Sequence, residues 1–355
     1  MKRNWSGVYA LACALLMIAG YITVFVFAWK TSTPDLARAV AGLALGFFFA
    51  PIFHELGHIL FAKTSNMAIA YTKCFCFKWT RKGKRFKFGF VSPFLPDETQ
   101  TVPKNGGDML ARAKAYTAGG LVLGGIFLFV DLVCALVTTL FFTPNYLFWG
   151  ILPYAAYLFF LNALPFEYPT GKTDALVLRG LKKGEDAEKT MLSAMEIQGR
   201  LYAGDSYADI DEKLFFDTPQ LPENEPLFAV MLDLRYRYYL EKDDLKNAAD
   251  CLNRLVVSQD YLAEEEQEKL AAECVYMHAL NGDLERAEEC GQLCQGYLRG
   301  ESAAAKRILA AFSSAFGKTN AVAPLKGQAE NALDREWIAG NAKFERKLLE
   351  KIDCE

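Results

Sequence analysis

The sequence predicts a mostly α-helical protein in which a polytopic membrane core is joined to a soluble helical domain. Of its 355 residues, 52% are hydrophobic, and the charge is divided unevenly along the chain. Residues 1–180 hold 17 basic and 8 acidic residues, a net charge of +9, so residues 181–355 must carry −12 for the whole chain to reach −3. An apolar basic half followed by an acidic half is typical of a membrane domain joined to an aqueous one, and this composition excludes a disordered chain.

Four apolar runs account for the membrane core. A helix needs about 20 apolar residues to cross about 30 Å of hydrocarbon, so each run is long enough. The runs cover roughly residues 8–29, 39–62, 117–142 and 146–165. The first is longer than the apolar part of a signal peptide and no clear cleavage site follows it, so we expect it to be a retained helix.

The basic residues in the short loops predict the orientation of these helices. With the N-terminus in the cytoplasm, the cytoplasmic segments hold 15 basic residues, whereas the outside loops hold only Lys30 and Arg38. We therefore expect an integral protein of a bacterial-type cell membrane, with both termini in the cytoplasm.

A β-hairpin is expected between the second and third apolar runs, within residues 71–92. Aromatic side chains alternate with other residues from Phe75 to Trp79 and again from Phe86 to Phe90, on both sides of a basic turn that contains Gly83. Alternation with period two on both sides of such a turn is typical of a hairpin. The aromatic face should rest on the membrane interface or on the helices, and the basic turn should meet anionic headgroups of the lipid bilayer. An ordinary basic loop is the alternative.

We expect three parts in the chain: a membrane core over residues 1–180, a linker region with short helices over 181–225, and a cytoplasmic helical domain over 226–355. In the last part the pattern Asp-Leu-x-x-Ala begins at Asp244 and recurs at Asp283, an offset of 39 residues. This resembles two helical hairpins of the tetratricopeptide type, although that repeat is normally shorter. An unrelated helical bundle is the alternative, and in either case the domain should pack, bind a protein partner or control access to the membrane core.

The candidate site lies near the cytoplasmic end of the second apolar run, where His54, Glu55 and His58 form a His-Glu-x-x-His pattern. A spacing of four residues places both imidazoles on one helix face, so both can reach one metal ion. Glu55 is then close enough to act as a general base on water, which is the arrangement of a zinc hydrolase. Ionisable residues inside an apolar helix are costly, and they usually mark function.

A catalytic zinc ion needs a third protein ligand and one open position. The fourth apolar run ends at Pro165, and Asp174 follows it on the expected cytoplasmic side. Asp174 is therefore the favoured third ligand. Asp131, inside the third run, and Glu167, closer to Pro165, stay open as alternatives.

Together these motifs resemble the site-2 protease family of intramembrane zinc metalloproteases. The residues that carry the resemblance, which covers about residues 39–180, are the His-Glu-x-x-His motif, a Gly-rich run from Gly119 to Gly125, and Asn162-x-x-Pro165 followed by Asp174. The resemblance implies His54, His58 and Asp174 as zinc ligands, Glu55 as the catalytic base, and Asn162 near the substrate or the oxyanion. The chain departs from the family in the spacing of nine positions from Pro165 to Asp174, which is longer than in many members, and in Ala175, where many members have glycine.

The expected function is hydrolysis of a peptide bond in a membrane-anchored protein or peptide, near the cytoplasmic face, by an enzyme with a Zn²⁺ cofactor. Two alternatives are a catalytically inactive relative that acts as a membrane binding or scaffold protein, and a metal transporter that uses the same residues. A transport site does not need a base beside its ligands, so Glu55 favours the enzyme. We expect no nucleic-acid partner.

Overall fold

The computed structural model describes residues 5–169, 171–257 and 264–352 of the chain. The basic residues Lys2 and Arg3, which contribute to the expected orientation, lie outside the described residues. The described part is predominantly helical, as predicted, and it forms two compact units. The first comprises Met1–Val102 and Asp108–Glu185, and the second comprises Pro103–Gly107 and Asp186–Glu355.

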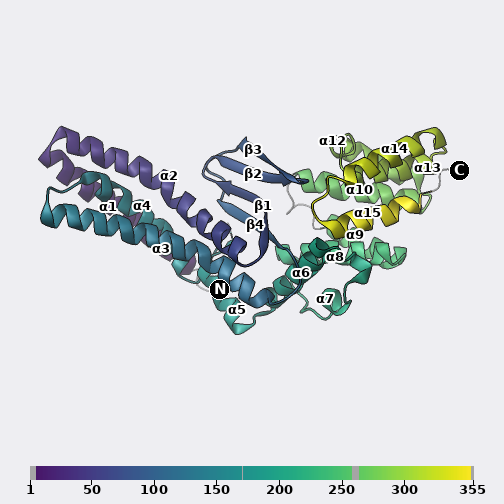
Figure 1. Ribbon diagram of the computed structural model, residues 1–355, viewed down its shortest axis with the longest axis horizontal. Helices are drawn as coiled ribbons and strands as arrows, with labels where there is room; N and C mark the ends of the chain where they lie inside the picture. The colour runs from purple at the N-terminus through teal and green to yellow at the C-terminus, as the bar shows by residue number, and fades with distance from the viewer. Residues whose placement is uncertain (1–4, 170, 258–263, 353–355) are drawn as a thin grey trace. The chain divides into compact units, whose positions relative to one another are not determined.

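Four long helices dominate the first unit, and they run alongside one another in Figure 1. All four are long and apolar enough to cross a membrane. They are α1 (Trp5–Thr31), α2 (Thr33–Thr64), α3 (Met109–Phe141) and α4 (Tyr146–Ala163).

Two of these helices begin well before the apolar runs that predict them, because polar caps start them earlier. The side chain of Ser32 accepts a hydrogen bond from the backbone of Asp35, and a proline occupies the first turn of α2. The carboxylate of Asp108 accepts one from the backbone of Ala111 and so caps α3. Such caps satisfy backbone N–H groups that a helix start leaves unpaired.

Glycines let α2 approach its neighbours at backbone distance. A Cβ added at Gly57 would overlap the carbonyl oxygen of Gly119 on α3, and one at Gly42 would overlap the backbone of α4 near Gly150. Small residues at such contacts are typical of helices that pack in a membrane. The close contact between Gly57 and Gly119 also brings α3 against the helix turn that carries His58.

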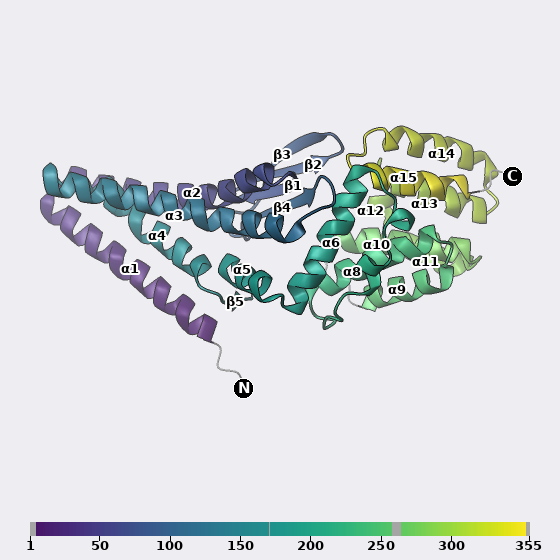
Figure 2. The same ribbon diagram turned by 60° about the horizontal axis from the view of Figure 1, so that its bottom comes forward.

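A four-stranded sheet lies beside the C-terminal part of α2 (Figure 2). Its strands are arranged in the order β3-β2-β1-β4. They are β1 (Met67–Cys74), β2 (Phe77–Lys82), β3 (Arg85–Phe90) and β4 (Glu98–Pro103).

The predicted hairpin is formed by β2 and β3, with Lys82 opposite Arg85 across the expected basic turn. Its first strand is shorter than the alternation indicates. Phe75 has a positive φ of 53° and lies in a turn between β1 and β2, so the residues before Phe77 do not continue that strand. These residues instead lead back into β1. Neither β1 nor β4 was predicted as a separate strand.

The sheet register gathers the aromatic side chains on one face. Phe77 lies opposite Phe90, and Trp79 lies opposite Phe88. Phe77 also contacts Phe48 of α2, with 6.2 Å between the ring centroids. One end of the aromatic face therefore rests on a helix, as expected, whereas Phe88 and Phe90 remain 53% and 73% exposed. Contact of these rings with a membrane stays a prediction.

The chain between α4 and the end of the first unit forms a two-stranded ribbon and a short helix. The strands β5 (Glu167–Tyr168) and β6 (Gly171–Lys172) pair antiparallel, and α5 (Asp174–Lys183) follows directly. The helix ends at Gly184, whose φ of 65° is the left-handed conformation that favours glycine.

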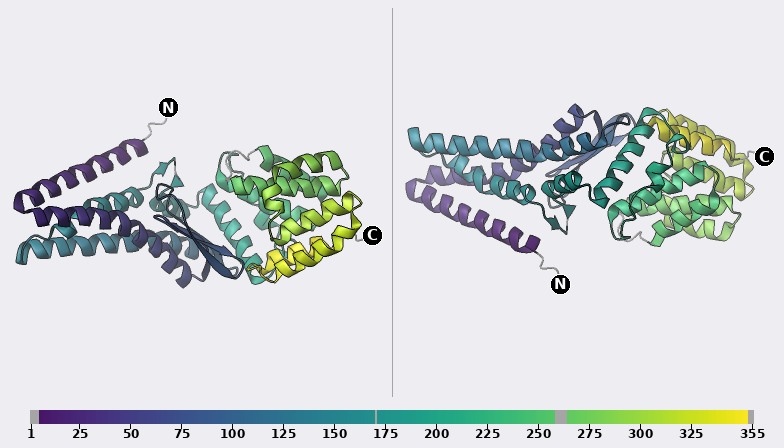
Figure 3. Two further views of the ribbon diagram at one scale, coloured as in Figure 1. Left: turned by 90° about the horizontal axis from the view of Figure 1, so that it is seen from above. Right: turned by 90° about the horizontal axis from the view of Figure 1, so that it is seen from below.

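From Asp186 onward, every element of the second unit within the described residues is a helix, and Figure 3 shows these helices packed against one another. Of the linker region expected over residues 181–225, residues 186–225 belong to this unit and include an 18-residue helix, α6. The elements are α6 (Asp186–Ala203), η1 (Tyr207–Asp209), α7 (Lys213–Phe216), α8 (Pro226–Glu241), α9 (Leu245–Val257), α10 (Glu264–Leu280), α11 (Leu284–Leu293), α12 (Gln295–Leu298), α13 (Ala303–Ala315), α14 (Thr319–Leu333) and α15 (Ala339–Glu350).

The two sequence repeats correspond to the helical hairpins α8–α9 and α10–α11, and α13–α14 forms a third. The turns of the three hairpins contain Asp243, Gly282 and Gly317, all with positive φ. Five residues after each of these positions a fully buried residue packs inside the hairpin, and these residues are Ala248, Ala287 and Val322. The third copy escaped sequence analysis because valine replaces alanine and the Asp-Leu pair is absent.

Candidate metal centre

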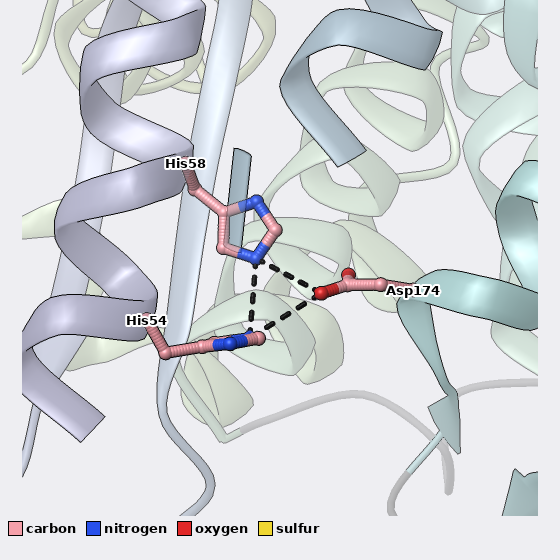
Figure 4. Close-up of side chains that lie close together, drawn as sticks. All are labelled: His54, His58 and Asp174. Atoms are coloured by element: carbon pink, nitrogen blue, oxygen red, sulfur yellow. Dashed lines mark hydrogen bonds and ion pairs between the residues drawn. The ribbon is translucent and has the colours of Figure 1, made fainter. Parts of the chain in front are cut away.

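Three potential metal ligands converge in the first unit. His54 and His58 lie one turn apart on α2, and Asp174 is the first residue of α5 (Figure 4). Their ligand atoms all lie within 4.8 Å of one another. Among the described residues this is the one group of three or more such side chains close enough to hold a metal ion.

The facing atoms of this group can all act as metal ligands. Oδ2 of Asp174 lies 3.3 Å from Nε2 of His54 and 3.4 Å from Nε2 of His58. The two Nε2 atoms lie 3.3 Å apart. Oδ2 is buried and makes no hydrogen bond. Buried polar atoms usually have hydrogen-bond partners, so a carboxylate oxygen that faces two imidazole nitrogens and makes no hydrogen bond could help to hold a metal ion.

The tautomer of His58 is set by its other ring nitrogen. Nδ1 lies 2.9 Å from the backbone carbonyl oxygen of Tyr116 on α3. Because a carbonyl oxygen only accepts, Nδ1 must carry the hydrogen and donate it. Nε2 then presents its lone pair to the group, as metal-bound histidines do when a carbonyl orients them.

The glycine-rich segment of α3 leaves room for the imidazoles. A Cβ at Gly120 would overlap Nε2 of His58 and would lie 2.7 Å from Cε1 of His54. One turn further on, a Cβ at Gly124 would make ordinary contact with Nδ1 of His54 at 3.6 Å. Gly120 is therefore required by the space that the two rings occupy, and Gly124 is not.

A short hairpin after α4 brings Asp174 to this position. The hydroxyl of Thr173 donates to the carbonyl of Leu164, and the backbone N–H of Thr173 donates to the carbonyl of Phe166. The same hydroxyl oxygen caps α5 by accepting from the backbone of Leu176. Residues 166–168 thus pair with residues 171–173, and the long spacing in the sequence does not separate Asp174 from the end of α4.

Glu55 is also buried beside this group, and it has a partner that sequence analysis missed. Its Oε2 accepts a hydrogen bond of 2.6 Å from the hydroxyl of Thr99 on β4. That hydroxyl lies 2.6 Å from the hydroxyl of Thr72 on β1. A run of alternating residues from Glu98 could have suggested a strand, but no signal in one sequence shows that this strand would pass over α2.

The remaining candidates lie apart from the three ligands. Asp131 is buried within α3 and Glu167 is exposed on β5, and neither belongs to the group. The amide of Asn162 donates to the carbonyl of Leu158 one turn earlier on α4. Its expected role near a substrate stays a prediction.

Comparison of the chain with protein-family models, with curated proteins and with solved structures finds no match. Only the residues of the site therefore indicate what the protein does.

Proposed function

We propose that the chain is an intramembrane zinc metalloprotease that hydrolyses a peptide bond of a membrane-anchored protein. The observation that carries the proposal is the convergence of His54, His58 and Asp174 beside the buried Glu55, on helices apolar enough to cross a membrane. The order of the motifs along the chain, which resembles that of the site-2 protease family, supports it.

The donor set favours zinc. Two imidazole nitrogens and one carboxylate oxygen are a common ligand set of catalytic zinc, and they leave a coordination position open. Hard cations such as Mg²⁺ and Ca²⁺ prefer oxygen ligands alone. A zinc ion held by these three residues would supply a Lewis acid and would lower the pKa of a water molecule at its open position.

The residues around the ligands have distinct tasks in this proposal. The carboxylate of Glu55 takes the proton from the attacking water and returns it to the leaving amine. The carbonyl of Tyr116 keeps Nε2 of His58 available as a ligand. Asn162 uses one amide N–H within α4, so its second N–H and its oxygen are the groups that would bind the substrate backbone.

The expected orientation places the site near the cytoplasmic side. His58 lies in the last two turns of α2, and the segment that follows is rich in basic residues. A helical substrate hides its carbonyl groups in hydrogen bonds, so it must unwind locally before it can be cleaved. In this proposal the acidic helical unit lies in the cytoplasm and binds a protein partner or controls access to the site.

Substitution of Glu55 tests the proposal. Glu55→Gln preserves the size of the side chain but removes the base, so it should keep the metal and abolish cleavage. The membrane proteomes of cells that produce the wild-type chain or this variant should differ in one or a few membrane proteins, which accumulate uncut with the variant. Identical proteomes, with both proteins present at equal levels, would reject proteolysis and favour the scaffold alternative.

A further inference from the structure

Strand β4 holds Glu55 from the side opposite to the helix that carries it. Thr99 donates to Oε2 of Glu55, and Thr72 on β1 lies behind Thr99. All three side chains are buried, with exposed fractions of 4% for Glu55, 6% for Thr99 and 5% for Thr72. In such surroundings a hydrogen bond to a carboxylate is stronger than in water.

The direction of this chain of hydrogen bonds follows from counting protons. A hydroxyl has one hydrogen, and Thr99 gives its hydrogen to Glu55. Thr99 can therefore only accept from Thr72, so Thr72 must be the donor in that contact. Thr72 thus donates to Thr99, and Thr99 donates to Oε2 of Glu55. The other carboxylate oxygen of Glu55, Oε1, is not bound by Thr99.

The position of Thr99 is fixed from two further directions. The hydroxyl of Tyr116 donates to the backbone carbonyl of Thr99, and the carbonyl of the same tyrosine orients His58. Before β4, the carboxylate of Asp97 accepts hydrogen bonds of 2.8 Å from Nζ of the buried Lys73 and from the backbone of Phe75. Strand β4 is thus tied both to β1 and to the residue that orients a metal ligand.

We propose that Thr99 is the positioning residue of Glu55, and that Thr72 in turn orients Thr99. This inference rests on the proposed function, because it assigns the two hydroxyls to the orientation of the base. Thr99 fixes Oε2, so that the side chain offers Oε1 to the attacking water in one conformation. A displaced catalytic group costs up to about 100-fold in rate, which sets the scale of the expected effect.

Paired substitutions test the role of Thr99. Thr99→Val keeps the shape of the side chain and removes the hydroxyl, whereas Thr99→Ser keeps the hydroxyl. We expect Thr99→Val to slow cleavage of the proteins that accumulate with Glu55→Gln by about 10-fold to 100-fold, through kcat rather than KM. Thr99→Ser should restore the rate to within about threefold of the wild type. Thr72→Val, which removes a hydroxyl one step further from Glu55, should have a smaller effect than Thr99→Val.

Two readouts do not depend on turnover. The zinc content of Thr99→Val should equal that of the wild type, because none of the three ligands is changed. Infrared difference spectra between each protein and its Glu55→Gln counterpart isolate the carboxyl band of Glu55. That band should shift in Thr99→Val and return in Thr99→Ser.

The outcomes separate this inference from the proposed function. Wild-type cleavage by Thr99→Val, with Glu55→Gln inactive, would overturn the positioning role and leave the protease proposal standing. Loss of zinc in Thr99→Val, or an equal loss of rate in Thr72→Val, would show a general structural role instead. If Glu55→Gln cleaves normally, the proposed function fails and the positioning role falls with it.

Discussion

Each of the two compact units contains a buried cluster of titratable side chains, and the two clusters differ in whether they contain a permanently charged cation. In the second unit Arg307 is fully buried between Glu273 and Glu345. Its Nη2 donates to Glu273 and its Nε donates to Glu345, both over 2.7 Å. Tyr236 donates a further hydrogen bond of 2.9 Å to Glu273, and the guanidinium stacks on the ring of Tyr276.

The cluster in the first unit consists of two histidines and one aspartate, and it contains no lysine or arginine side chain like Arg307. His54, His58 and Asp174 face one another with atoms that can bind a metal ion, and Oδ2 of Asp174 has no hydrogen bond. Burial acts to lower the pKa of Arg307, but the two carboxylates outweigh burial and hold that pKa well above its usual value. A buried cluster that contains its own permanent cation is explained by folding, whereas one that needs a cation from outside indicates a ligand.

The largest expected effect comes from removing the cation of the second cluster. Arg307→Ala leaves Glu273 and Glu345 buried without a partner, and breaking such a pair costs about 3–5 kcal/mol of stability. Hydrogen exchange of the amides of α10 and α13, measured in the full-length protein, should report this loss. Zinc content should stay unchanged, because none of the three proposed zinc ligands is changed.

An exposed ion pair in the same unit provides the control. Nζ of Lys269 lies 2.5 Å from Oε1 of Glu266 at the surface. Such exposed ion pairs contribute about 0–1 kcal/mol to the free energy of unfolding. Lys269→Ala should therefore leave the exchange of α10 nearly unchanged. If Arg307→Ala had an equally small effect on exchange, the cluster around Arg307 would not stabilise the unit as its contacts indicate.

The next largest effect is expected at Gly120, which leaves room for the rings of His54 and His58. Gly120→Ala places a methyl group where Nε2 of His58 lies, so the ring must move. We expect metal affinity to fall about 10-fold to 100-fold, as for other changes that misorient a ligand. Competition with a fluorescent zinc chelator measures the affinity. Gly124→Ala, whose methyl group would make an ordinary contact with His54, is the matched control and should bind zinc like the wild type.

The smallest effect concerns two thiols, one near each cluster. Burial raises the pKa of Cys74 to about 12 and that of Cys274 to about 12. A raised pKa leaves less thiolate, so at pH 8 only about one thiol in 10,000 is reactive at either site, and reactivity should rise with pH up to about 12. Iodoacetamide labelling followed by peptide mass spectrometry measures this for each cysteine.

A zinc chelator should then distinguish the two thiols. Removal of the metal should loosen the first cluster and make Cys74 react faster, whereas Cys274 should not respond. Equal changes at both sites would contradict the division into a metal-dependent and a metal-independent cluster.

Sequence reasoning found the parts of this protein whose patterns are local. The apolar runs give four helices of sufficient length, the spacing of His54 and His58 places both rings on one helix face, and the alternation around Gly83 gives the hairpin β2–β3. Asp174 was favoured by its place after Pro165, and the structure brings it to the two histidines.

The features that sequence reasoning missed depend on contacts between distant segments. Thr99 reaches Glu55 across 44 positions of the chain, and Tyr116 reaches His58 across 58. A single threonine on a short strand has no periodic pattern to mark it. The third helical hairpin was not recognised as a repeat for a different reason. Val322, another apolar residue, occupies the position of the repeated alanine, so the sequence pattern does not recur there.

The zinc content of the purified protein tests the central claim most directly. We predict one zinc ion per wild-type chain and less than about a tenth of this in Asp174→Ala, because loss of one of three ligands opens the site. Asp131→Asn and Glu167→Gln should retain the full zinc content. Stoichiometric zinc in Asp174→Ala, or loss of zinc in either control alone, would contradict the assignment of the third ligand and with it the proposed site.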